Sequence, residues 1–91
     1  MHYHEEAQRF VVYNSDHEEI GEITFRITDD SILIIDHTFV DPNYRGQKIA
    51  NELVKLVVDK ARNESYSLLP LCPFAVKEFD RHPAYQEIQK R

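Results

Sequence analysis

The sequence has few of the features that mark secreted, membrane-spanning or nucleic-acid-binding proteins. It contains one cysteine, so no disulfide can form within the chain, and it has no run of about eighteen apolar residues that would span a membrane. The first residues, MHYHEEAQRF, lack the charged and then apolar pattern of a signal peptide. The net charge of −5 disfavours sequence-independent binding to nucleic acid. We therefore expect a cytoplasmic protein that binds neither membranes nor nucleic acid.

Several common functional motifs are also missing. The sequence contains no Walker loop, no zinc ligand set and no serine triad. His2 and His4 lie beside Glu5 near the N-terminus, where flexible histidines bind metals adventitiously, so we expect no metal site. The 91 residues, 42% apolar and 30% charged, suit one small globular domain over residues 1–91, with residues 1–8 frayed. A monomer is the simplest expectation.

Three stretches in the first half alternate in the manner of β-strands. Residues 9–13, 19–28 and 32–40 are rich in β-branched and aromatic side chains and are separated by short polar turns. In the second stretch we expect Ile23, Phe25 and Ile27 to point inward. The third stretch is apolar on both alternating sets, which predicts a central strand covered on both faces.

The hydrophobic period changes after Gly46. Apolar residues then recur every three or four positions as far as Ala61, which predicts an amphipathic helix that ends near residues 62–64. Its first turn has free backbone N–H groups and partial positive charge, and the preceding loop carries Arg45 and Lys48. Such a junction suits a phosphate, although a tight turn with solvated cations explains the same residues.

The remaining residues predict a short strand and two short helices. Residues 65–71 should return beside residues 32–40 as a parallel strand, because a helix separates the two. Pro70 indicates that this strand is distorted or splayed near its end. Pro73 can open a helix over residues 74–81, and a last turn or two can follow in residues 84–90.

These segments together resemble a known family. The pair His37-Thr38, the runs YRGQKIANELV and Cys72-Pro73-Phe74, and the C-terminal His-Pro-Ala-Tyr are similar to the short subfamily of the GNAT N-acetyltransferase superfamily. The likeness extends in order from about Phe10 to Ile88. It implies an α+β fold, in which an antiparallel meander precedes a β-α-β unit with splayed parallel strands and a short C-terminal helix.

The resemblance also implies a cofactor, acetyl-CoA, and residues that would bind it. The superfamily's phosphate loop reads Gln/Arg-x-x-Gly-x-Gly/Ala; Arg45 and Ala50 match its ends, whereas Lys48 replaces the middle glycine and adds both bulk and charge. Coenzyme A would lie between the splayed strands, with its pyrophosphate on the helix N-terminus and its pantetheine beside the end of the third strand. The implied cofactor-binding residues are Thr38, Val40, Arg45, Gly46, Gln47, Lys48, Ile49 and Ala50.

Three further residues are candidates for catalysis, each with a structural alternative. His37 is a candidate general base, a role that histidine side chains often serve, but a histidine bonded to a neighbouring carbonyl is equally compatible with the sequence. Cys72 precedes a helix N-terminus, which can activate a thiol, yet most free cysteines are small buried hydrophobes. Tyr85 is a candidate general acid or cofactor-site wall, and the favoured alternative is a ring that closes the core.

We therefore expect an acetyl-CoA-binding protein that transfers acetyl to an amine, either a small molecule or a protein tail. Two alternatives remain open. A chain this short lacks helices that would build an acceptor pocket, so it can be a binding module with little transfer activity. Acyl transfer can also proceed through an acyl-enzyme on Cys72, with His37 as the base of the thiol. The acidic net charge favours a cationic acceptor.

Overall fold

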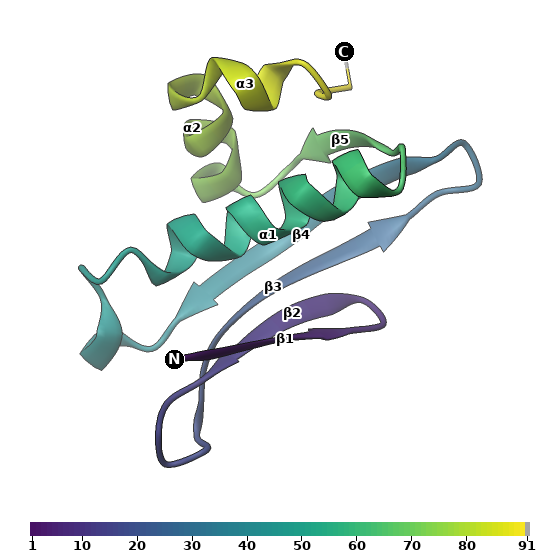
Figure 1. Ribbon diagram of the computed structural model, residues 1–91. Helices are drawn as coiled ribbons and strands as arrows, with labels where there is room; N and C mark the ends of the chain where they lie inside the picture. Colours follow the sequence, from purple (N-terminus) through teal and green to yellow (C-terminus); the bar gives the residue numbers. More distant parts are fainter. Residues whose placement is uncertain (91) are drawn as a thin grey trace.

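The computed structural model describes residues 1–90, so that Arg91 of the predicted domain lies outside the described residues. One five-stranded sheet has the order β1-β2-β3-β4-β5, with antiparallel pairs from β1 to β4 and a parallel pair of β4 with β5 (Figure 1). The elements are β1 (His2–Glu6), β2 (Arg9–Tyr13), β3 (Glu19–Ile27), β4 (Ile32–Val40), the 3₁₀ turn η1 (Pro42–Tyr44), α1 (Ile49–Asn63), β5 (Ser67–Pro70), α2 (Pro73–Arg81) and α3 (Pro83–Gln86). This is the predicted α+β architecture. In residues 1–90, no helix has the length and apolar character needed to cross a membrane.

The N-terminal residues form a strand, so the prediction that they are frayed was wrong. β1 pairs with β2 along its whole length, from His2 opposite Tyr13 to Glu6 opposite Arg9. Tyr3 packs against the core, and the Arg9 guanidinium bonds the Glu6 carboxylate at 2.7 Å. The polar sequence hides this strand because β1 is an edge strand with little apolar surface to bury.

Helix α1 covers one face of the sheet and supplies much of the core. Its apolar stripe is buried against side chains from β2, β3, β4 and β5. The helix ends in a Schellman motif, in which the Tyr66 N–H bonds the Ala61 carbonyl at 2.8 Å and the Ser65 N–H bonds the Arg62 carbonyl. Ser65 has φ 61°, the left-handed conformation that glycine usually supplies at this position.

A β-bulge in β4 changes which side chains face the helix. Thr24 pairs with His37 and the next residue, Phe25, pairs with Ile35, so Asp36 is an extra residue in the strand. Leu33 and Ile35 face the core before the bulge, and after it the inward set becomes Thr38 and Val40. The predicted alternation through the whole strand was therefore wrong.

The expected burial of both faces of β4 was also wrong. α1 and α2 contribute to the same buried cluster, on one side of the sheet. On the other side Asp36 and His37 are exposed and Phe39 is 46% exposed, although Ile34 is buried. Ile27, expected to point inward, is 40% exposed because it lies at the end of β3.

The parallel strand β5 is short and ends where the splay begins. Its pairs with β4 run only from Ile32–Ser67 to Ile35–Pro70, and the Leu71 N–H then bonds the Ile35 carbonyl. Pro70 thus closes the ladder, as its position in the sequence predicts. Beyond Ile35, the edge of β4 on the side of β5 has no strand partner among the described residues, which leaves an opening between the two strands. The chain continues from β5 into α2.

Candidate functional site

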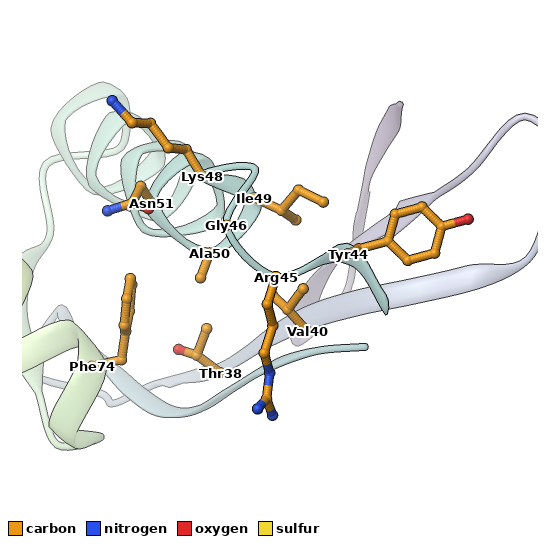
Figure 2. Close-up of a pocket in the computed structure, with 10 residues that line it drawn as sticks. All are labelled: Thr38, Val40, Tyr44, Arg45, Gly46, Lys48, Ile49, Ala50, Asn51 and Phe74. Carbon is orange, nitrogen blue, oxygen red and sulfur yellow. The ribbon is translucent and has the colours of Figure 1, made fainter. Parts of the chain in front are cut away.

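A cavity of about 370 Å³ lies between the second half of β4, the first turn of α1 and the start of α2 (Figure 2). We call it the β4–α1 cavity. Its lining residues are Thr38, Val40, Tyr44, Arg45, Gly46, Lys48, Ile49, Ala50, Asn51 and Phe74. The residues that the sequence predicts to bind the cofactor are Thr38, Val40 and residues 45–50. All of them line the cavity except Gln47, which is exposed.

The loop between η1 and α1 lines this cavity together with the first turn of the helix. Gly46 has φ 84° and Lys48 has φ 61°, so two left-handed residues turn the chain into the helix. The first internal hydrogen bond of α1 joins the Glu52 N–H to the Lys48 carbonyl at 3.1 Å. The N–H groups of Ile49 and Ala50 therefore have no partner within the helix, and they suit an anion.

Arg45 and Lys48 add two cations beside these N–H groups, and the side chains extend in different directions. In Figure 2 the Arg45 guanidinium lies on the side of Thr38, whereas the Lys48 ammonium points away from Thr38 and Phe74. The bulk of Lys48 therefore does not fill the middle of the cavity, where its replacement of the family's usual glycine had suggested an obstruction. Lys48 has a left-handed backbone, a conformation that glycine adopts more readily than other residues.

Tyr44 is a wall of the cavity that the sequence analysis did not identify. Its hydroxyl accepts a hydrogen bond from Asn14 Nδ2 at 2.9 Å. Asn14 is buried in the turn after β2, and its Oδ1 also accepts from the backbone N–H groups of Asp16 and Glu18. The turn thus fixes the loop that precedes α1. The Asn-Ser-Asp run indicated a turn, but nothing in it indicated a contact thirty residues later.

Cys72 lies directly behind the cavity wall. Thr38, which lines the cavity, places its Oγ1 at 3.2 Å from Cys72 Sγ. Cys72 is the N-cap of α2, where Sγ accepts a hydrogen bond from the Ala75 N–H at 3.4 Å, and the residue is only 8% exposed. Cys72 therefore lies at a helix N-terminus, as its place in the sequence predicts. Its side chain also caps the helix and forms part of the core.

His37 does not join Cys72 or the cavity. Thr38 and Val40 both line the cavity, so their neighbour His37 projects from the opposite face of β4, where it pairs with Thr24. It is exposed there. The structure therefore does not bring together the predicted base and the predicted nucleophile, and the bulge at Asp36 is the physical reason.

Tyr85 also lies outside the cavity lining. Its ring packs against Phe79 at a centroid distance of 5.5 Å and stacks on His82 at 4.5 Å. Burial raises the pKa of the Tyr85 hydroxyl, and the nearby carboxylates of Glu78 and Asp59 raise it further. This is the packing role that the sequence analysis favoured over a catalytic one.

Phe74 and Asn51 complete the cavity, and neither was predicted. Phe74 stands on the first turn of α2 and faces Ala50 across the opening in Figure 2. Asn51, in the first turn of α1, donates a hydrogen bond from Nδ2 to Glu78 Oε1 of α2 at 2.8 Å. The family resemblance includes Phe74, but the sequence offered no signal that pairs Asn51 with Glu78.

Comparison with known proteins places this geometry in a family. The family model described as GCN5-related N-acetyl-transferase matches residues 9–88. No match is found among curated proteins. Among solved structures, a GCN5-like protein from Staphylococcus aureus has a TM-score of 0.79 and 27% identity, and the match covers 98% of this chain and 87% of that one.

Larger proteins share the same fold over part of their length. The GNAT family N-acetyltransferase YhbS from Escherichia coli, solved in complex with CoA, has a TM-score of 0.64 and 25% identity, over 69% of this chain and 38% of that chain. Rv2747 from Mycobacterium tuberculosis, also solved with CoA, has a TM-score of 0.69 and 22% identity, over 84% of this chain and 47% of that one. The chain belongs to the GCN5-related N-acetyltransferase family.

Proposed function

We propose that the chain binds acetyl-CoA in the β4–α1 cavity and transfers the acetyl group to an amine. The observation that carries this proposal is the junction of β4 and α1. There, free N–H groups of Ile49 and Ala50, the left-handed Gly46 and two cations line one continuous cavity with an apolar wall at Phe74. Fixed N–H groups and cations suit the phosphates of coenzyme A, and the apolar wall suits its acyl arm.

The free edge of β4 supports the placement of the pantetheine. β5 pairs with only Ile32 to Ile35, so the strand edge beyond the bulge has no ladder partner in residues 1–90. Peptide-like amides can add to such an edge in the manner of a short strand. The thioester would then lie near Thr38, at the end of the cavity that Cys72 closes from behind.

The reaction needs a neutral amine and a stabilised oxyanion. The amine nitrogen attacks the thioester carbon, a C–N bond forms, and the C–S bond breaks to release coenzyme A, which takes up a proton. Backbone N–H groups on the free edge of β4 can stabilise the oxyanion. His37 projects from the opposite face of the strand, so the proposal assigns it no role as base of a thiol in the cavity.

A second route, through an acetylated Cys72, has one observation in its favour. Thr38, which lines the cavity, places its hydroxyl 3.2 Å from the sulfur. Against it stand the 8% exposure of Cys72 and its use as the N-cap of α2. A third possibility is a binding module with little transfer activity, because the lining of the cavity comes from β4, the loop before α1, α1 and α2 and is shared with the proposed cofactor site.

The test is an amide chemical-shift titration with acetyl-CoA and with coenzyme A. Saturable shifts centred on Gly46 to Ala50 and reaching Thr38 and Phe74 would support the cofactor site. The absence of shifts at millimolar ligand would overturn it. Release of coenzyme A in the presence of a polyamine or a lysine-containing peptide, above the rate without amine, separates a transferase from a binding module. The cytoplasmic location and the monomeric state stay predictions.

A further inference from the structure

A buried carboxylate stands behind the β4–α1 cavity. Glu78, on the inward face of α2, is only 1% exposed. Its Oε1 accepts from Asn51 Nδ2 at 2.8 Å and lies 3.5 Å from the Arg81 guanidinium, while Oε2 lies 3.3 Å from His82 Nε2. Of these contacts, the one with Asn51 is the shortest and the only one that reaches another element.

Packing alone does not require a carboxylate at this position. An apolar side chain of similar volume would fill the space between α1 and α2 without the loss of hydration that a buried charged group suffers. Arg81 and His82 are on the same helix, or directly follow it, and both are substantially exposed, so neither needs Glu78 to hold it in the fold. The specific consequence of Glu78 is therefore the orientation of Asn51.

A carboxylate decides which way the Asn51 amide faces. An ionised carboxylate only accepts hydrogen bonds, so it takes the Nδ2 side of the amide and turns Oδ1 away from itself. No described residue donates a hydrogen bond to Asn51 Oδ1. In residues 1–90, every buried side-chain nitrogen or oxygen atom has a hydrogen-bond partner, so Oδ1, which has none, is not buried. Oδ1 is therefore an accessible acceptor on a residue that lines the cavity.

We propose that Glu78 is a positioning residue, which fixes the Asn51 amide so that Oδ1 accepts a hydrogen bond from an N–H group of the bound acyl-CoA. This rests on the function proposed above. The N–H group is either a pantetheine amide or the adenine amine, which share the chemistry of a neutral donor. The contact would select for the cofactor's orientation in the cavity rather than for its charge.

The distribution of charge around the cavity agrees with this orientation. Arg45 and Lys48 lie at the loop end, where the phosphates find cations and free N–H groups. The carboxylate of Glu78 lies behind Asn51 and disfavours an anion there. A cofactor with its phosphates on the loop and a neutral N–H over Asn51 satisfies both ends, whereas the reverse orientation places phosphate beside the buried carboxylate.

The experiment compares three variants by calorimetric titration with acetyl-CoA. Glu78→Met removes the carboxylate and leaves Asn51 free to rotate. The double variant Asn51→Leu with Glu78→Met removes both partners, which keeps the interface between the helices apolar and folded. Glu78→Gln keeps an acceptor for Nδ2. Asn63→Leu makes the same chemical change as Asn51→Leu at an exposed position at the far end of α1 and is the matched control.

We expect Glu78→Met and the double variant to bind acetyl-CoA roughly threefold to tenfold more weakly than the wild type, as the loss of one neutral hydrogen bond implies. Glu78→Gln should stay within about twofold, because its amide can still accept from Nδ2. Melting temperatures of all variants check that they fold. In the wild type, the side-chain ¹⁵N signals of Asn51 should shift when acetyl-CoA is added, which a purely structural contact would not produce.

Two fragments distinguish the source of the N–H group. A weaker affinity of the double variant for S-acetyl-4′-phosphopantetheine identifies a pantetheine amide, and a weaker affinity for adenosine 3′,5′-diphosphate identifies the adenine amine. The proposal is overturned if a folded double variant, or a folded Glu78→Met, binds acetyl-CoA as tightly as the wild type. If the wild type itself does not bind acetyl-CoA, the proposed function fails first, and the inference fails with it.

Discussion

Replacing Lys48 with glycine should stabilise the protein and weaken its binding to acetyl-CoA at the same time. Lys48 has φ 61°, in the left-handed region where a side chain meets the backbone, and it stands at the N-cap of α1 without a capping hydrogen bond. Its ammonium group also lies at the positive end of the helix dipole. Both effects oppose folding, and the proposed cofactor site gives the lysine a role that offsets this cost.

The stability gain can be worked out from two opposing terms. The left-handed conformation costs a non-glycine residue about 1–2 kcal/mol. Relief of this strain is partly offset, because glycine makes the unfolded chain more flexible and this costs about 0.5–1 kcal/mol of stability. With the relief at the dipole, the net gain from Lys48→Gly is about 1 kcal/mol, which raises the melting temperature by roughly 4–8 °C in a domain of this size.

Two matched variants isolate the backbone term. Ser65→Gly relieves the same conformation, φ 61°, at the end of α1 and away from the cavity, so it should raise the melting temperature by a similar amount and leave acetyl-CoA binding unchanged. Gly46→Ala should lower stability by about 1 kcal/mol through φ 84° alone, because no atom lies within 4 Å of the added Cβ.

Binding is then measured by calorimetric titration at low and at high salt. Lys48→Gly should bind acetyl-CoA several-fold more weakly at low salt, and the difference from the wild type should shrink at high salt, where charges are screened. Stabilisation by Ser65→Gly but not by Lys48→Gly would refute the account of the strained loop. An unchanged affinity at low salt would show that the Lys48 ammonium is not part of the site.

Three further predictions concern other parts of the molecule. Cys72→Ser should be at least as stable as the wild type, because serine caps helices well, whereas Cys72→Ala should lose about 1 kcal/mol of stability. A transfer activity that survives both changes would exclude the covalent route. Intact-mass measurement checks for acetylated Cys72. Burial raises the pKa of Tyr85 above its ordinary value of 10.0, so the phenol keeps its proton to higher pH in the native state than in the unfolded chain. The stability that the neutral phenol contributes is complete below about pH 10 and is lost as the pH rises further. In denaturant unfolding, Tyr85→Phe should therefore lose less stability than the wild type between about pH 9 and pH 11. Arg9→Met should break its ion pairs with Glu6, Glu19 and Glu22, cost about 1 kcal/mol and speed hydrogen exchange in β1; unchanged exchange there would contradict the tie between Arg9 and the edge strand.

Local patterns in the sequence were sufficient for most of the elements and for the position of the loop that precedes α1. The bounds of β2 and β4 agree with the prediction, and α1 spans the residues whose apolar period is helical. The pairing of β4 with β5 is parallel, as the intervening helix requires. These features depend on residues that are neighbours along the chain, or on a connection whose length fixes its topology, so a single sequence contains the necessary information.

The failures share a different physical origin. β1 is held by pairing with β2 and by Arg9, not by its own apolar pattern, so its polar residues suggested a frayed end. The contact of Asn51 with Glu78 joins residues twenty-seven positions apart on two helices, whose relative rotation no periodicity specifies. Each of these depends on a partner that lies elsewhere in the sequence.

The bulge at Asp36 has the largest consequence for function. Without it, strict alternation from Ile35 would place His37 on the face of the cavity and Thr38 on the opposite face. One inserted residue exchanges them: Thr38 meets Cys72 at the cavity wall, and His37 projects from the other side of the sheet. A role for His37 in catalysis would therefore require an acceptor that reaches the thioester from that other side, through the opening between β4 and β5. His37→Ala separates these cases, since it should leave the binding of acetyl-CoA unchanged and would slow transfer only if the amine passes that face.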